Sequence, residues 1–206
     1  MPAIVYFHGG GHVIGSLDTH DFVARNLCGG TGAMVASVDY RMGPEHKFPA
    51  AVDDCFAALQ WVHANAASLG ADPDRIGVHG DSAGGNLAAV TALLARDAGG
   101  PRLRLQSLVY PVTDYGLTGH SYDKYASGYG ILTKAATGLV PRSLFAPPRG
   151  RERLARFADP RRQPRGSERR RSSSPRNATC CTTTERTTPR HCGAPASRSN
   201  TANMPA

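Results

Sequence analysis

Residues 79–85 read His-Gly-Asp-Ser-Ala-Gly-Gly, which places Ser82 at the centre of a Gly-x-Ser-x-Gly pattern. The run 75–79 precedes the pattern and has the composition of a short buried strand, and the run 86–96 follows it with Ala and Leu at helical spacing. A chain that turns this sharply from strand to helix needs small residues around the serine and leaves the hydroxyl exposed at the helix N-terminus. The stretch therefore predicts a nucleophile elbow with Ser82 as the nucleophile.

This motif alone is weakly specific, because a glycine-rich chain contains Gly-x-Ser-x-Gly by chance about one time in ten. A second motif adds to it: the apolar run 3–7 ends in His-Gly-Gly-Gly at residues 8–11. Successive glycines after a strand leave their backbone N–H groups unobstructed, and acyl transfer through a serine needs such donors for the developing oxyanion. The alternative interpretation is a glycine-rich turn that binds a phosphate or no ligand.

Strand and helix patterns alternate over the first two thirds of the chain. The predicted strands lie near 3–7, 34–39, 75–79 and 104–110, and the predicted helices near 19–29, 51–69 and 83–96. Strands separated by such helices form right-handed βαβ units in a parallel sheet, whose carboxyl ends carry the active site. The sequence therefore predicts an α/β fold with a mostly parallel sheet and flanking helices, in which His8 and Ser82 converge.

Five stretches together resemble the hormone-sensitive-lipase-like family of α/β-hydrolases, also called bacterial family IV esterases. They are residues 4–12, 16–20, 38–54, 80–87 and 110–114. The resemblance runs from about residue 2 to about residue 136 and implies a partial α/β-hydrolase catalytic core over 1–136, which is part of a larger domain in relatives. The residue after the three glycines is usually aromatic in that family and lines the acyl or alcohol pocket. It is His12 here, so His12 is a candidate pocket residue.

The resemblance also implies a role for each motif residue. Ser82 attacks a short-chain carboxylic ester and forms an acyl-enzyme, and the oxyanion hole consists of the N–H groups of Gly9, Gly10 and Ala83. His8 orients the oxyanion loop and is not the general base, and Asp81 holds neighbouring loops. The residues with structural roles in the two motifs are His8, Gly11, Gly80, Asp81 and Gly84.

The partners of the nucleophile are expected to be missing. In the family the chain order is Ser, Asp, His, but only His120 and His191 follow Ser82. His191 lies in Arg-rich sequence, His120 lies in a loop that is not catalytic in relatives, and Asp114 is interpreted as structural. We therefore expect the triad Asp and His to be absent from this chain and its own activity to be low, because an unassisted serine hydroxyl is a poor nucleophile.

Composition changes abruptly towards the C-terminus. Residues 1–140 hold 9 Lys and Arg against 12 Asp and Glu, whereas residues 141–206 hold 15 Arg against 4 acids, which together give the net charge of +8. The second segment contains only four residues that are Leu, Ile, Val or Phe. Such a segment cannot bury enough apolar surface to offset chain entropy, so 137–206 is predicted to be a disordered, Arg-rich tail.

We interpret this tail as the product of a shifted reading frame that begins near Ala136. Regrouping the codons of residues 172–206 from their third bases, with allowed codon choices, yields a sequence that resembles the family's next strand, acid-bearing loop and helix. The alternatives are a solvated extension and an Arg-rich arm that binds nucleic acid or membrane. The tail lacks interleaved aromatics and lysines, so no nucleic-acid partner is expected.

The remaining polar residues suggest no further chemistry. His20, His46, His63 and His79 are expected to pack or lie at the surface, and no spacing of histidines with Cys28 or Cys55 suggests a metal site. No metal or cofactor is expected, and the partner is a small-molecule ester. No signal peptide and no 18-residue apolar run is present, so we expect a cytoplasmic protein without a membrane span. The alternative function is a non-catalytic, small-molecule-binding protein with the same fold.

Overall fold

The computed structural model describes residues 1–117, 119–127, 132–144 and 178–181, the last four by their backbone. Four parallel strands form the sheet together with a short antiparallel one, in the order β4-β3-β1-β2-β5. The strands are β1 (Ala3–Phe7), β2 (Met34–Val38), β3 (Ile76–Asp81), β4 (Leu103–Val109) and β5 (Ala178–Cys181). The helices are α1 (Leu17–Thr31), α2 (Ala50–Ala64), α3 (Ala83–Asp97), α4 (His120–Lys124) and α5 (Lys134–Leu144).

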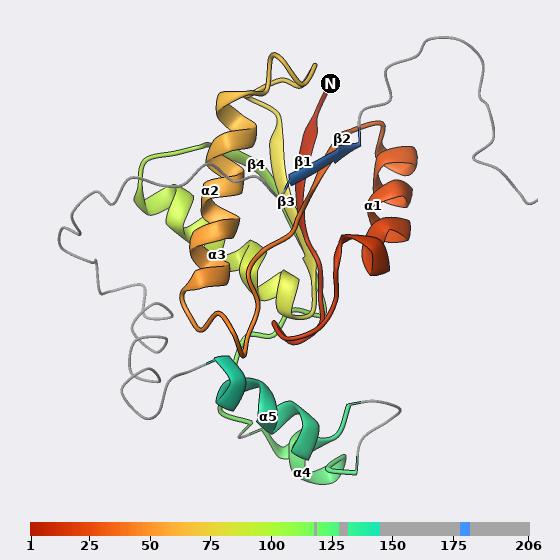
Figure 1. Cartoon of the computed structure of the whole chain (residues 1–206), viewed down its shortest axis with the longest axis vertical. Coiled ribbons are helices and arrows are strands. Elements are labelled where there is room, and N and C mark those ends of the chain that lie inside the picture. The colour runs from red at the N-terminus through yellow and green to blue at the C-terminus, as the bar shows by residue number, and fades with distance from the viewer. Residues whose placement is uncertain (118, 128–131, 145–177, 182–206) are drawn as a thin grey trace, which may run out of the picture.

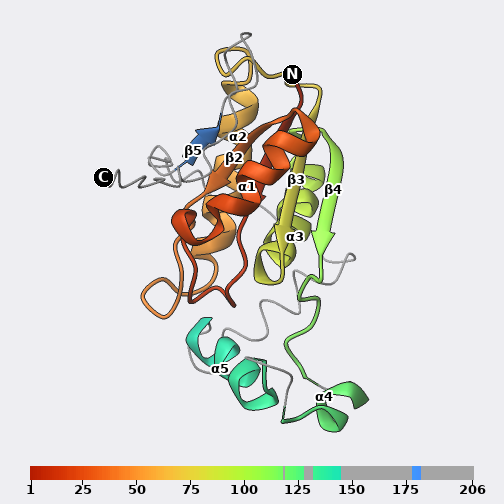
Figure 2. The ribbon, with the colours of Figure 1, turned by 90° about the vertical axis from the view of Figure 1, so that its right-hand side faces the viewer.

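Helices cover both faces of the sheet: α1 lies on one side, and α2 and α3 lie on the other (Figures 1 and 2). The central strands β1 and β2 are buried along their whole length, as is usual for parallel strands between two helical layers. Alternate side chains of β1 point into the two hydrophobic clusters, one on each face of the sheet. Val5 and Phe7 pack with Leu59 of α2, while Ile4 and Tyr6 pack under α1. This arrangement confirms the predicted α/β fold class with a mostly parallel sheet.

Local signals explain the element ends. Ser16 and Thr19 form a capping box at the start of α1, and Gly32 closes the helix with φ 64. The sequence predicts that the second helix runs to residue 69, but α2 ends at Ala64 and turns follow as far as Gly70, which has φ 68. The apolar residues beyond Ala64 lie in those turns. Ala66 packs into the core from a turn, so its burial does not require the helix to continue.

The predicted tail is described only in part. Residues 137–144 continue helix α5 past the expected boundary at 136, and residues 178–181 pair antiparallel with β2, from Val38 opposite Ala178 to Val35 opposite Cys181. Leu144 and Pro141 are buried, which gives α5 an apolar face to pack with. The other residues of the predicted tail lie outside the described residues.

Helices α4 and α5 lie beyond the carboxyl ends of the parallel strands, where a site in such a sheet is expected (Figures 1 and 2). Within the residues described, no helix is both long enough and apolar enough to cross a bilayer.

Candidate active site

Ser82 lies at the junction of β3 and α3 with φ 54 and ψ −117. A non-glycine residue at positive φ is strained and persists only where its surroundings hold it. Here the backbone does so: the N–H of Ser82 donates to the carbonyl of Val109 at 2.9 Å, and its carbonyl accepts from Asn86 and Val112, each at 3.1 Å. The hydroxyl makes no capping hydrogen bond to α3, so it is left for other partners.

The flanking glycines are required by close backbone approach. A Cβ at Gly80 would overlap with the carbonyl of Gly84, and a Cβ at Gly84 would overlap with the carbonyl of Phe7 in the neighbouring strand. The elbow therefore has the geometry that the sequence predicts for a Gly-x-Ser-x-Gly turn.

The two sequence motifs lie next to each other. Strands β1 and β3 pair in parallel with Phe7 opposite Gly80, so the loop that begins at His8 leaves the sheet beside the elbow. Gly9 lies so close to Asp81 that a Cβ on it would overlap with the carboxylate. Gly10 has φ 113. The structure thus brings the glycine loop next to the elbow, as the sequence predicts.

Asp81 links the elbow to β1. The hydroxyl of Tyr6 donates to Oδ1 of Asp81 at 2.8 Å. Burial, together with this carboxylate, raises the pKa of Tyr6 well above its usual value, so the phenol keeps its proton. The contact joins the elbow to a strand, and the role of Asp81 in holding neighbouring loops stays a prediction. Tyr6 was not singled out from the sequence, where a hydroxyl-bearing aromatic within an apolar strand is the only signal.

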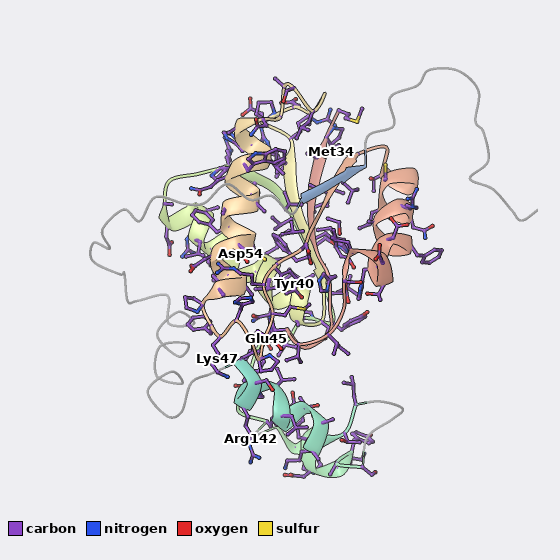
Figure 3. All side chains as sticks on the ribbon, viewed as in Figure 1. Met34, Tyr40, Glu45, Lys47, Asp54 and Arg142 are labelled. Carbon is purple, nitrogen blue, oxygen red and sulfur yellow. The ribbon has the colours of Figure 1, made fainter. Side chains whose placement is uncertain are left out.

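His8 is fully buried beneath the glycine loop. Its Nδ1 lies 2.7 Å from the carbonyl of Gly9, its ring stacks on Tyr40 at 4.5 Å between centroids, and the hydroxyl of Tyr40 donates to the His8 carbonyl at 2.7 Å. Figure 3 shows Tyr40 in the interior of the molecule. Burial lowers the pKa of His8, so the ring is neutral and donates from Nδ1 to Gly9. These contacts suit a residue that orients the loop, and sequence reasoning missed Tyr40.

His12 is also inside the structure, with 4% of its surface exposed and φ 61. Its Nε2 lies 2.6 Å from the hydroxyl of Tyr115. Burial, and in second place the neighbouring His8, lowers the pKa of His12 to about 4. Tyr115 was not predicted, because it lies 103 residues away in sequence.

Helix α5 packs against the glycine loop and against the segment after β2. Val140 lies 3.1 Å from the position that a Cβ on Gly11 would take. Nζ of Lys47 donates to the carbonyl of Ser143 at 3.0 Å, and the N–H of Phe48 donates to Leu144 at 2.9 Å. Figure 3 shows Lys47 beside the end of α5.

The other predicted residues lie as follows. Asp114 accepts from the N–H of Gly116 at 2.8 Å, a turn contact that fits a structural role. His120 is exposed at the start of α4, and His191 lies outside the described residues. His79 is buried in β3 with Nδ1 2.9 Å from Ser107, His20 packs near His8, and His46 and His63 are exposed.

Cys28 and Cys55 are free and buried, and burial raises the pKa of the Cys55 thiol. Over the residues that the structure describes, no group of three or more His, Cys, Asp or Glu side chains is arranged to hold a metal ion.

Comparison with known proteins finds a matching family and several similar chains. The model of the alpha/beta hydrolase fold family matches residues 4–175. Carboxylesterase NlhH of Mycobacterium tuberculosis is 57% identical over 126 residues, which are 61% of this chain and 40% of that protein. The ethyl acetate hydrolase of Pseudomonas putida is 44% identical over 130 residues, 62% of this chain and 40% of that protein. The crystal structure of an esterase from Pyrobaculum calidifontis superposes with a TM-score of 0.72 at 48% identity, over 77% of this chain and 52% of that one. The chain thus spans about 40% of the length of the curated relatives it matches.

Proposed function

Since the chain belongs to the alpha/beta hydrolase fold family, we propose that its site is built to hydrolyse carboxylic esters of short acyl chains through an acyl-enzyme at Ser82. The observation that carries the proposal is the strained elbow at Ser82, held by three backbone hydrogen bonds with its hydroxyl left out of the helix cap. Relatives named carboxylesterase and ethyl acetate hydrolase support the substrate class.

The oxyanion hole in this proposal consists of backbone N–H groups from both motifs. Gly9 and Gly10 contribute from the loop beside the elbow, and Ala83 contributes as the first residue of α3. Donors placed where charge develops stabilise the transition state, and each is worth about 10²- to 10³-fold in rate. The N-terminus of α3 adds a partial positive charge at the same place.

We propose as well that this chain lacks the base that activates Ser82. Among the described residues no histidine is hydrogen-bonded to the Ser82 hydroxyl, and His120 is exposed on α4. His12 is a poor substitute, because its pKa lies at about 4 and its Nε2 is engaged by Tyr115. Removal of triad partners lowers the rate by about 10⁴-fold or more, so the purified chain is expected to turn over esters very slowly.

A change of reading frame near Ala136 would account for the missing partners. The abrupt change from an acidic body to an Arg-rich tail supports this interpretation. Sequencing the coding DNA across codons 130–140 tests it directly. One uninterrupted frame in an independent clone would rule the interpretation out.

Chemical rescue tests the proposed chemistry. Imidazole at high concentration is expected to restore part of the hydrolysis of p-nitrophenyl acetate, because it replaces the missing base, and peptide mass spectrometry is expected to find the acetyl group on Ser82. The Ser82→Ala chain measures the direct reaction of imidazole with the ester and serves as the background. If the two chains hydrolyse the ester equally at every imidazole concentration, Ser82 is not the nucleophile.

The absence of a bonded histidine at Ser82 in the described residues also favours a second function, a small-molecule-binding protein that does not catalyse. The two functions differ in one measurement. A fluorophosphonate probe in the presence of imidazole labels an activatable serine at a rate that depends on Ser82, whereas a pure binding protein stays unlabelled.

A further inference from the structure

One ring nitrogen of His12 is buried without a hydrogen-bond partner. Nδ1 has none among the described residues, although His12 is only 4% exposed, whereas Nε2 is paired with Tyr115 at 2.6 Å. Nearly all buried polar atoms in native proteins are paired, so an unpaired one calls for an explanation such as a bound water or a ligand. His12 follows the three glycines of the proposed oxyanion loop directly.

The Tyr115 hydroxyl determines which nitrogen of His12 carries the proton. Burial keeps both rings uncharged, since it lowers the pKa of His12 to about 4 and raises the pKa of Tyr115. A phenol is the stronger donor of the two and an imidazole lone pair the stronger acceptor, so Tyr115 donates to Nε2. The ring proton then lies on Nδ1, which makes Nδ1 a donor without an acceptor.

The loop backbone fixes the position of this donor. The carbonyl of His12 accepts from the N–H of Gly43 at 2.8 Å, and both His12 and Gly11 have left-handed φ values, 61 and 62. Val140 of α5 packs against Gly11. Gly43 thus holds the backbone of His12, and Tyr115 holds its ring at Nε2.

We propose that Nδ1 of His12 donates a hydrogen bond to the substrate and makes the site prefer esters that carry an acceptor oxygen near the ester carbonyl, such as alkoxyacetates, over esters of plain hydrocarbon acids. The proposal rests on the proposed ester site and adds a substrate class to it. His12 acts here on specificity and takes no part in bond making. Phenylalanine at this position would supply no ring N–H donor.

His8 supplies the competing explanation. Since Nδ1 of His8 donates to the Gly9 carbonyl, its Nε2 is an acceptor, and it too is buried without a partner among the described residues. One water that accepts from His12 and donates to His8 would pair both atoms without any ligand. In that case the site would show no preference for an acceptor oxygen.

The test compares two esters that differ by one atom group. Phenyl methoxyacetate has an ether oxygen where phenyl butyrate has a methylene, so the two match in size. Binding to the full-length Ser82→Ala chain, which cannot consume them, is measured by titration. We expect the methoxyacetate to bind about 3- to 10-fold more tightly, the range of one net hydrogen bond. His12→Phe is expected to bring the ratio to about one, and Tyr115→Phe to lower it, because the ring proton is no longer held on Nδ1.

Nitrogen NMR of the unchanged chain gives a second readout that needs no His12 variant. The spectrum is expected to show the His12 proton on Nδ1, and the Nδ1 resonance is expected to shift with the methoxyacetate and not with the butyrate. A proton on Nε2, equal affinities, an unshifted Nδ1 with bound ester, or no binding of either ester overturns the proposal. The outcome is independent of catalysis: if imidazole rescue fails while the preference holds, the site binds these esters without hydrolysing them.

Discussion

The elbow at Ser82 and the glycine loop after His8 lie side by side, but they are held in place by different means. Backbone hydrogen bonds of Ser82 and the close approach of Gly80 and Gly84 to backbone carbonyls fix the elbow. Buried polar side chains fix the loop, and they come from distant segments: Tyr40 reaches the carbonyl of His8, and Tyr115 reaches the ring of His12. The glycines of both motifs are visible in sequence, whereas the distant tyrosines that hold the loop are not.

The largest effect is expected at the elbow, from Gly84→Ala. The new Cβ in the first turn of α3 would overlap with the carbonyl of Phe7, which is paired on both sides within the sheet and cannot move away without breaking it. We expect a loss of about 3 kcal/mol or more in the free energy of unfolding, measured with urea. Gly29→Ala in α1 is the matched control, since nothing lies within 4 Å of its Cβ position, and it is expected to stabilise the protein by about 0.5–1 kcal/mol. Equal small effects would show that close approach does not hold the elbow.

The loop is expected to respond to pH through His12, whose pKa is lowered by burial. The pKa of His12 is about 4 in the folded chain and 6.5 in the unfolded one, so the unfolded chain takes up a proton first as pH falls. The contribution of His12 to the free energy of unfolding is therefore expected to be fully present above about pH 7. It is expected to be lost as the pH falls from about 6.5 to 4, by about 3 kcal/mol in total.

The variant His12→Phe separates this contribution from others. The pKa values of His8 and His79 are lowered as well, so the variant is expected to reduce the slope of stability against pH and not to abolish it. Gln60→Ala, at an exposed position of α2 without a titrating group, is the control and should leave the slope unchanged. An unchanged slope in His12→Phe would mean that His12 is accessible to protons in the folded chain.

A smaller effect is expected from Tyr40→Phe. The variant keeps the ring stacked on His8 but leaves the buried His8 carbonyl without its donor, which costs about 1–3 kcal/mol in the free energy of unfolding. Tyr110→Phe removes a hydroxyl from a side chain that is 72% exposed and should have almost no effect. If the two variants unfold at the same urea concentration, the loop does not depend on the Tyr40 contact.

These contrasts explain what the sequence could predict. The strands near 3–7 and 34–39, the α/β class and the position of Ser82 follow from local patterns, and the structure agrees with them. The match to the alpha/beta hydrolase fold family and to named esterases confirms the resemblance to hormone-sensitive-lipase-like esterases. The roles of the motif residues are still predictions.

The rest could not be predicted, because no local pattern encodes it. His12 lies next to three glycines in sequence, but its partner Tyr115 is known only once the segment after β4 is placed. The continuation of α5 to Leu144 was missed for a similar reason. The composition of this segment does not predict a core of its own. Its end is held by hydrogen bonds from Lys47 and Phe48, which lie 96 residues before their acceptors in the sequence.

The smallest effect concerns the side-chain hydrogen bond between Tyr6 and Asp81, which joins the elbow to β1. A double-mutant cycle of Tyr6→Phe and Asp81→Ala is expected to give an interaction energy of about 1 kcal/mol, because the Asp81 carboxylate is only half-buried and water screens it. Gly9 packs on the same carboxylate and provides a second way to join the motifs, which Tyr6→Phe leaves intact. An interaction energy of zero would therefore assign the link between the two motifs to the contact with Gly9 alone. Packing of Gly9 against Asp81 would then be enough to keep the elbow and the loop in place, and the Tyr6–Asp81 hydrogen bond would not be needed.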